Sequence, residues 1–191
     1  MTGSSLLPVT LHNGKLLFLF GRDIGDTPGF SCFGGGVKEE EKNLFQAALR
    51  EGAEEIKGFL GNPSQLEEWI QTHGGHYDLD FKLNRGHYYC HLFWMDYDPR
   101  LPVYYQQNHD FLMSAMDRSH WKANKHLFEK VEIDWMSVSD MKRRRNEFRP
   151  FYRDIVDQLI EKRFEIYEFA NSCCGKKKVG MSNRKTKRNK K

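Results

Sequence analysis

Residues 34–59 read GGGVKEEEKNLFQAALREGAEEIKGF, and this stretch decides how the rest of the chain is interpreted. Three glycines lead into a segment with apolar residues at helical spacing, which predicts a loop followed by a helix. Near the end of that helix Glu51, Glu54 and Glu55 stand at positions i, i+3 and i+4, on one face. Like charges this close repel each other, and a hard divalent cation with oxygen ligands would relieve the repulsion. The pattern predicts a metal-dependent enzyme that acts on phosphates.

A glutamate-rich helical face is more often solvated surface than a metal site, and the context of this one decides between the two. The glycines follow an apolar run at residues 29–33. Apolar side chains at positions 44, 47, 48 and 49 also give the same helix a buried side. The acidic face is therefore expected to be held against a folded body.

The segment resembles the Nudix box, which reads Gly, five residues, Glu, seven residues, then Arg-Glu-apolar-x-Glu-Glu-x-Gly-apolar. Arg50, Glu51, Glu54 and Glu55 match the arginine and the three glutamates that follow it. The resemblance implies an α/β fold with a Nudix-type mixed β-sheet sandwiched between helices. It also implies a hydrolase that acts on a diphosphate bond.

Three positions depart from the pattern of the box. Counting back from the arginine puts Lys42 at the first glutamate, with Gly36 as the opening glycine. Glu41 and Gly35 also fit, with eight residues instead of seven before the arginine, and both alignments stay open. Gly52 takes an apolar position, and one residue is inserted before the closing glycine.

The resemblance also implies the catalytic groups. In this family the box glutamates and a glycine carbonyl hold Mg²⁺ or Mn²⁺, which neutralises the diphosphate and lowers the pKa of a water molecule. Arg50 would orient a glutamate through a charge-assisted fork. The implied metal ligands in this chain are Glu51, Glu54, Glu55 and the carbonyl of Gly36 or Gly35.

Many family members carry a further acid six residues before a tryptophan. Glu129 has this spacing from Trp135 and would act as a metal ligand or general base. Glu132 is the competing residue, and an exposed strand acid without a catalytic role is the third interpretation.

The strands are predicted from apolar density and turn residues. An Asn-Gly pair at positions 13 and 14 predicts a hairpin between residues 9–12 and 15–20. Further strands are predicted at residues 30–33, 87–95 and 127–135.

The helices are predicted from capping residues and periodicity. The box helix is expected at residues 39–56, and a short helix is expected to begin with a capping box of Ser64 and Glu67. A third helix is predicted at residues 108–116. Pro150 is expected to open a terminal helix, with one apolar side formed by Phe151, Ile155, Leu159 and Phe164.

The 191-residue chain is predicted to hold one domain at residues 1–170, with an insertion at about 62–126, and a basic tail at residues 171–191. Nine of its 30 Lys and Arg residues lie in residues 175–191, which contain no acid. Such a segment is expected to be disordered and to attract RNA through counterion release; a localisation signal or a solubilising tail is the alternative. The predicted RNA-binding residues are Lys176, Lys177, Lys178, Arg184, Lys185, Lys187 and Arg188.

No signal peptide or transmembrane segment is predicted, and four scattered cysteines favour a reducing, intracellular compartment. The cytoplasm is the first choice, the host cytoplasm for a viral protein, and the basic tail also suits the nucleus. Cys173 and Cys174 before the basic run resemble a palmitoylated membrane anchor, although free thiols at a helix end are commoner.

Several aromatic and histidine residues are assigned to structure rather than function. The pairs His73/His76 and His87/His91 are interpreted as structural or surface residues. Base stacking is a weaker alternative to core packing for Trp94, Tyr104, Tyr105 and Trp121.

Several features resemble the Nudix proteins of large DNA viruses, which include mRNA-decapping enzymes: the glycines at 34–36, the Gly-Phe-Leu-Gly ending at 58–61, the segment 102–112 and the basic tail. The resemblance covers about residues 5–170, and the box is its specific motif. This resemblance favours capped RNA as the nucleotide-containing substrate, cleaved to a nucleoside diphosphate and 5′-monophosphate RNA. Free nucleotides, dinucleoside polyphosphates and diphosphoinositol polyphosphates stay open. An inactive Nudix-fold RNA-binding protein is the alternative from another class, and the three intact glutamates argue against it.

Overall fold

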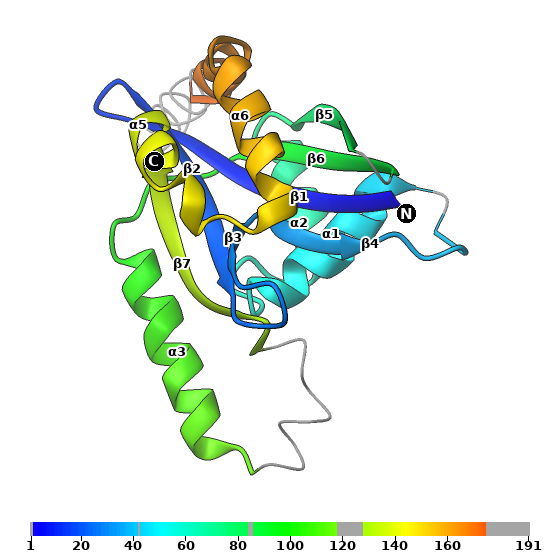
Figure 1. Ribbon diagram of the computed structural model, residues 1–191, viewed down its shortest axis with the longest axis vertical. Coiled ribbons are helices and arrows are strands. Elements are labelled where there is room, and N and C mark those ends of the chain that lie inside the picture. Colours follow the sequence, from blue (N-terminus) through cyan, green and yellow to red (C-terminus); the bar gives the residue numbers. More distant parts are fainter. Residues whose placement is uncertain (1, 42, 84–85, 118–127, 175–191) are drawn as a thin grey trace, which may run out of the picture.

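The computed structural model describes residues 2–41, 43–83, 86–117 and 128–174. A seven-stranded mixed sheet lies between helices (Figure 1), as the fold prediction required. The strands are β1 (Thr2–His12), β2 (Lys15–Asp23), β3 (Gly29–Ser31), β4 (Phe33–Gly36), β5 (His76–Leu83), β6 (Gly86–Trp94) and β7 (Lys130–Ser137). The main helices are α1 (Leu44–Glu55), α2 (Pro63–Thr72), α3 (Leu101–Ala115), α5 (Val138–Arg143) and α6 (Arg153–Glu161).

The long strand β1 organises the sheet. It pairs in parallel with β6 along one edge, and its other edge is shared by β4 and β2, both antiparallel. The strand predicted at residues 30–33 is therefore two strands, because the chain changes partner at Cys32: β3 pairs with β2, and β4 pairs with β1. The predicted hairpin is confirmed, with both turn residues at positive φ.

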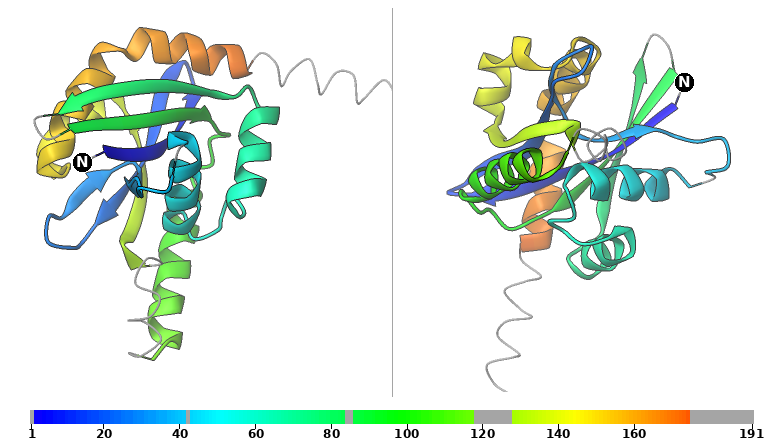
Figure 2. Two further views of the ribbon diagram at one scale, coloured as in Figure 1. Left: turned by 90° about the vertical axis from the view of Figure 1, so that its right-hand side faces the viewer. Right: turned by 90° about the horizontal axis from the view of Figure 1, so that it is seen from below.

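Two apolar cores lie on opposite faces of the sheet. One contains Phe18 and Phe20 of β2 together with Ile155 and Leu159 of α6, and the other contains Leu19 with residues of α1 and α2. Figure 2 shows α6 and the helical residues 163–174 on one side of the sheet and α1 and α2 on the other. Successive side chains of a strand point to opposite faces, so each central strand contributes to both cores.

The box helix begins later than predicted. α1 starts at Leu44 rather than near residue 39, because Asn43 caps it: the side-chain oxygen accepts bonds from the amides of Phe45 and Gln46. The helix ends as predicted near Gly58, where Lys57 and Gly58 both adopt positive φ.

Two other helix starts were also predicted wrongly. In α2 the capping box consists of Asn62 and Gln65, not Ser64 and Glu67, because Pro63 occupies the first turn. α3 begins at Leu101 instead of residue 108, again with a proline in its first turn.

Strand β5 was not predicted, although its sequence carries a signal. Tyr77, Leu79, Phe81 and Leu83 alternate with polar residues, the pattern of a half-buried strand. β7 overlaps the predicted strand at 127–135 from Lys130 onward, and Leu127 lies outside the described residues.

The single apolar side predicted for the terminal helix is wrong in part. Pro150 opens a 3₁₀ turn (Pro150–Tyr152), α6 follows, and the helix is interrupted at Lys162 before continuing over residues 163–174. Ile155 and Leu159 are buried, whereas Phe151 is 42% and Phe164 69% exposed. Phe164 follows Leu159 by five residues, which in a helix of 3.6 residues per turn places it about 140° around the axis.

The segment that follows the box is joined to it through Tyr105 of α3. Its ring is fully buried, and its hydroxyl donates to the carbonyl oxygens of Glu55 at 2.7 Å and Lys130 at 3.2 Å. The helix α3, which extends from the body beside β7 (Figure 1), therefore contacts the end of the box helix directly.

We expect Tyr105→Phe to lower the free energy of unfolding by about 1–2 kcal/mol, because two buried carbonyls lose their shared donor. The adjacent Tyr104 is 43% exposed and serves as the matched control; Tyr104→Phe should change stability by less than about 0.5 kcal/mol. Urea denaturation measures both values, and equal effects would contradict the anchoring role.

Candidate active site

The sheet and the box helix approach each other closely where the glycines lie. Gly52 of α1 packs on Leu6 of β1, and a Cβ at this glycine would lie 2.7 Å from the Leu6 side chain. The departure from the box pattern at Gly52 is thus explained by close packing. At the start of the helix, Ser4 of β1 donates to the carbonyl of Leu44 at 2.7 Å.

Arg50 clamps two glutamates. Its Nε donates to Oε1 of Glu41 at 2.9 Å and its Nη2 to Oε2 of the same carboxylate at 3.2 Å, while Nη1 lies 2.5 Å from Glu51. Bonding to this guanidinium lowers the pKa of Glu41 to about 2. Of the two candidates for the first box glutamate position, Glu41 contacts Arg50, and Lys42 lies outside the described residues.

The glycine strand β4 accommodates the box carboxylates. A Cβ at Gly35 would lie 2.8 Å from the carboxylate of Glu51, and the amide of Gly34 donates to Glu55 at 2.7 Å. Glu54 is half-buried on the same helix. Only glycine leaves room for a carboxylate this close to the strand, so the glycine run and the glutamates form one structural unit.

A buried ion network supports this unit, and the sequence analysis missed it. Lys130 is 1% exposed, and its Nζ lies 2.6 Å from Asp23, 2.7 Å from the Ser31 hydroxyl and 3.8 Å from Glu55. Arg149 adds a second cation, 3.4 Å from Asp23. Buried lysines are rare, so no pattern in the strand Lys130–Ser137 pointed to this one.

The carboxyl group of Glu55 has an unusually high pKa. Burial raises its pKa to about 8, against the opposing attraction of Lys130. A raised pKa is one mark of a functional carboxylate.

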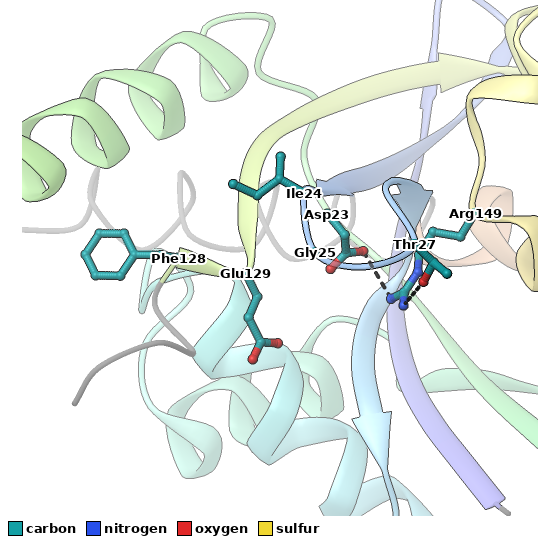
Figure 3. A pocket seen from close by; sticks show the side chains of 7 residues that line it. All are labelled: Asp23, Ile24, Gly25, Thr27, Phe128, Glu129 and Arg149. Atoms are coloured by element: carbon teal, nitrogen blue, oxygen red, sulfur yellow. Dashed lines mark hydrogen bonds and ion pairs between the residues drawn. The ribbon is translucent and has the colours of Figure 1, made fainter. Parts of the chain in front are cut away.

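A cavity of about 410 Å³ adjoins the network (Figure 3). Asp23, Phe128, Glu129 and Arg149 line it, and Figure 3 shows Arg149 bonded to Asp23 and Thr27. Glu129, the further acid predicted from the sequence, therefore lines the same cavity as Asp23. Asp23 in turn pairs with Lys130, which lies beside Glu55.

The competing acid lies elsewhere. Glu132 is paired with Arg22, whose Nε is 2.5 Å from its carboxylate, and it lines a separate surface hollow beside α3.

A second cavity, of about 390 Å³, lies along the glycine strand. Its walls include Gly34, Gly35 and Gly36, the rings of Tyr88 and Phe151, and again Arg149. Arg149 therefore borders both cavities, and its buried Nε has no hydrogen-bond partner among the described residues.

The residue inserted before the closing glycine has a structural role. Lys57 extends to α3, where its Nζ lies 2.8 Å from Nδ1 of His109 and 4.1 Å from the centroid of the Tyr105 ring. Burial lowers the pKa of Lys57 to about 8.

The remaining predicted residues are the aromatic residues, the cysteine before the basic run and the basic run itself. Trp94 and Tyr105 are core residues, Tyr104 is exposed, and Trp121 lies outside the described residues. Cys173 is buried against Gly74, which argues against a lipid on this thiol. The basic residues from Lys176 to Arg188 also lie outside the described part, within which no helix is long and apolar enough to cross a bilayer.

The residues present fit a hard divalent ion. Glu51, Glu54 and Glu55 offer oxygen donors from one helix, and the absence of a side chain at Gly35 leaves room for the carboxylate of Glu51. Oxygen-only donor sets suit Mg²⁺ or Mn²⁺.

Comparison with known proteins shows the family of the chain. The family model described as the NUDIX domain matches residues 4–159, so the chain belongs to the Nudix family. It is a Nudix hydrolase domain, of the class that acts on diphosphate bonds. No curated protein matches the sequence significantly.

Among solved structures, the chain is similar to an Ap4A hydrolase of C. elegans in a binary complex, with 16% identity, a TM-score of 0.47 and coverage of 86% of this chain and 96% of that one. It is also similar to the NUDIX domain of Shewanella oneidensis NrtR complexed with ADP ribose, with 14% identity, a TM-score of 0.45 and coverage of 85% and 87%. A NUDIX hydrolase from Nitrosomonas europaea gives 16% identity, a TM-score of 0.41 and coverage of 86% and 88%. Similarity at this level says nothing about the substrate of this chain.

The raised pKa of Glu55 predicts a pH-dependent stability in metal-free protein. The pKa rises from 4.5 to about 8 on folding, so the folded state binds more protons between these values and stability falls as pH rises through them. Glu55→Gln should therefore stabilise the protein at pH 8.5 by about a few kcal/mol, seen as a higher melting temperature. At pH 4.5 the stabilisation should be much smaller. Thermal unfolding in EDTA measures this. Glu68→Gln, on the exposed face of α2, is the control, and a pH-independent difference for Glu55→Gln would contradict the assignment.

Proposed function

We propose that this chain hydrolyses a diphosphate bond in a nucleotide derivative, with Mg²⁺ or Mn²⁺ held by Glu51, Glu54, Glu55 and the carbonyl of Gly36 or Gly35. The main support for the proposal is the contact between the box helix and the glycine strand. Glu51 packs on Gly35, and Glu55 accepts a hydrogen bond from the amide of Gly34. The bound ion would neutralise the diphosphate and favour ionisation of water.

The chain's own residues orient the reacting groups. Arg50 holds Glu51 through a charge-assisted bond and is itself held by Glu41, so the carboxylate has a fixed direction. Lys130 faces Glu55 and favours its ionised form, which a metal ligand requires. Glu129 is the better candidate for a general base than Glu132, because it borders the cavity beside Asp23.

Arg149 and two aromatic rings supply the groups that a nucleotide needs. The guanidinium of Arg149 borders both cavities and would pair with a phosphate oxygen of the substrate. The rings of Tyr88 and Phe151 offer apolar surface in the second cavity for a base or sugar.

The more specific proposal is that the substrate is capped RNA, cleaved as in mRNA decapping. Its support is the basic run at residues 175–191, with nine Lys and Arg and no acid, together with the resemblance to viral Nudix proteins. A viral source and a cytoplasmic location in the host cell belong to the same proposal.

The hydrolase proposal is tested with Mn²⁺ and a panel of cap-labelled RNA, dinucleoside polyphosphates, sugar nucleotides and inositol pyrophosphates, with the products identified. On the best substrate Glu54→Gln should reduce kcat by about 10²-fold or more, since it removes one anionic donor but keeps the shape of the side chain. Glu129→Gln should also slow turnover. Glu132→Gln is the matched control, because its carboxylate is paired with Arg22. Near-normal activity of Glu54→Gln in excess metal would overturn its role as a ligand.

Deletion of residues 175–191 tests the RNA proposal. Because nine positive charges act on the phosphate backbone, the truncated protein should bind capped RNA more weakly and with a flatter salt dependence. Hydrolysis of a small dinucleotide should barely change. Equal losses on both substrates would show that the segment supports the fold or the site instead.

A further inference from the structure

A second cluster of metal-binding side chains lies on the neighbouring strands β5 and β6. His76 and Asp78 are two residues apart in β5, and His91 of β6 is the registered partner of Asp78. All three side chains therefore point to the same face of the sheet, the face that α1 covers. None of them belongs to the glutamate site.

The three groups converge on one carboxylate oxygen. Oδ1 of Asp78 lies 2.6 Å from Nδ1 of His91 and 3.4 Å from Nε2 of His76. Each residue offers one ligand atom, and these three atoms lie within 4.8 Å of one another.

The hydrogen bonds of Ser4 favour one tautomer of His91. The Ser4 hydroxyl donates its only proton to the carbonyl of Leu44 at 2.7 Å, so it can only accept at His91 Nε2, 3.1 Å away. In neutral His91 the lone pair of Nδ1 then faces the carboxylate of Asp78. Two electron-rich atoms 2.6 Å apart repel each other unless a proton lies between them or a metal ion lies beside them.

The surroundings of the cluster resemble the second shell of a metal centre. A metal-binding histidine usually donates its other ring N–H to a fixed acceptor, and the Ser4 hydroxyl lies in that place, 3.1 Å from Nε2 of His91. The His76 ring is stacked on Phe45, with centroids 3.9 Å apart, which fixes its orientation.

We propose that His76, Asp78 and His91 bind a transition-metal dication, for which Zn²⁺ is the best fit. Two imidazole nitrogens and one carboxylate suit Zn²⁺ better than Mg²⁺, which prefers oxygen donors. Tetrahedral Zn²⁺ with bonds of about 2.0–2.2 Å places its ligand atoms about 3.3–3.6 Å apart. Asp78 is 63% exposed and can move by the small amount required. Three protein ligands leave a fourth position for water.

The ion would link the β5–β6 hairpin to the start of the box helix. His91 is bonded to Ser4, which holds the carbonyl of Leu44, and His76 packs on Phe45; both of these residues stand in the first turn of α1. An ion bound at this place would stabilise the native state by mass action. It would take no part in hydrolysis.

The test uses full-length protein stripped with EDTA and then saturated with Mg²⁺, so that the glutamate site is occupied. Isothermal titration with Zn²⁺ should show one further equivalent bound, accompanied by a higher melting temperature. Asp78→Asn should weaken this binding by at least about 10-fold. Asp80→Asn is the matched control, since Asp80 pairs with His87 at 2.9 Å on the same two strands, outside the His76–Asp78–His91 cluster. Co²⁺ in place of Zn²⁺ should give ligand-field absorption in wild type and Asp80→Asn but not in Asp78→Asn.

Two results would overturn the proposal: no Zn²⁺ binding by the Mg²⁺-saturated wild type, or equal weakening by Asp78→Asn and Asp80→Asn. Because Asp78 is exposed, its asparagine variant should fold normally, which circular dichroism checks. His76→Gln, which removes a second proposed ligand, should reproduce the loss. Hydrolysis in Mg²⁺ should be unchanged in Asp78→Asn, so this test is independent of the proposed function.

Discussion

The structure around the active site depends on a buried carboxylate, that of Glu55. It is 5% exposed and accepts a bond from the amide of Gly34, so it ties the end of the box helix to the glycine strand. A buried carboxylate is costly unless it is paired and hydrogen-bonded. Lys130, itself held by Asp23 and Ser31, supplies the neighbouring positive charge. Strands β2, β3 and β7 are thereby connected to the same site.

Helix α3 is connected to Glu55 through the backbone carbonyl of that residue. Tyr105 donates to the carbonyl of Glu55, and Lys57, next to the closing glycine, contacts His109 of α3. The extra residue in the box and the long segment after it are therefore related features. The helix Leu101–Ala115 packs on β7 and holds the end of the box helix in place.

Much of the fold was predictable, because local patterns specify it. The Asn-Gly hairpin, the strand at 87–95 and the acidic helix face all follow from spacing and turn residues. Helix starts were less predictable from the sequence. Asn43 and Asn62 can cap a helix only because their own backbone is extended, which the tertiary structure decides. The alternating pattern of β5 was present in the sequence and was overlooked.

The sequence by itself determined the box and its Arg-Glu-x-x-Glu-Glu core, because these residues are neighbours on one helix. Only the tertiary structure brought Glu41 to Arg50, buried Lys130 between Asp23 and Glu55, and placed Arg149 beside both cavities. It also joined His76 to His91, although the sequence had suggested different histidine pairs. The reason is that strand register and chain reversals decide which distant side chains meet, and neither is encoded in short-range spacing.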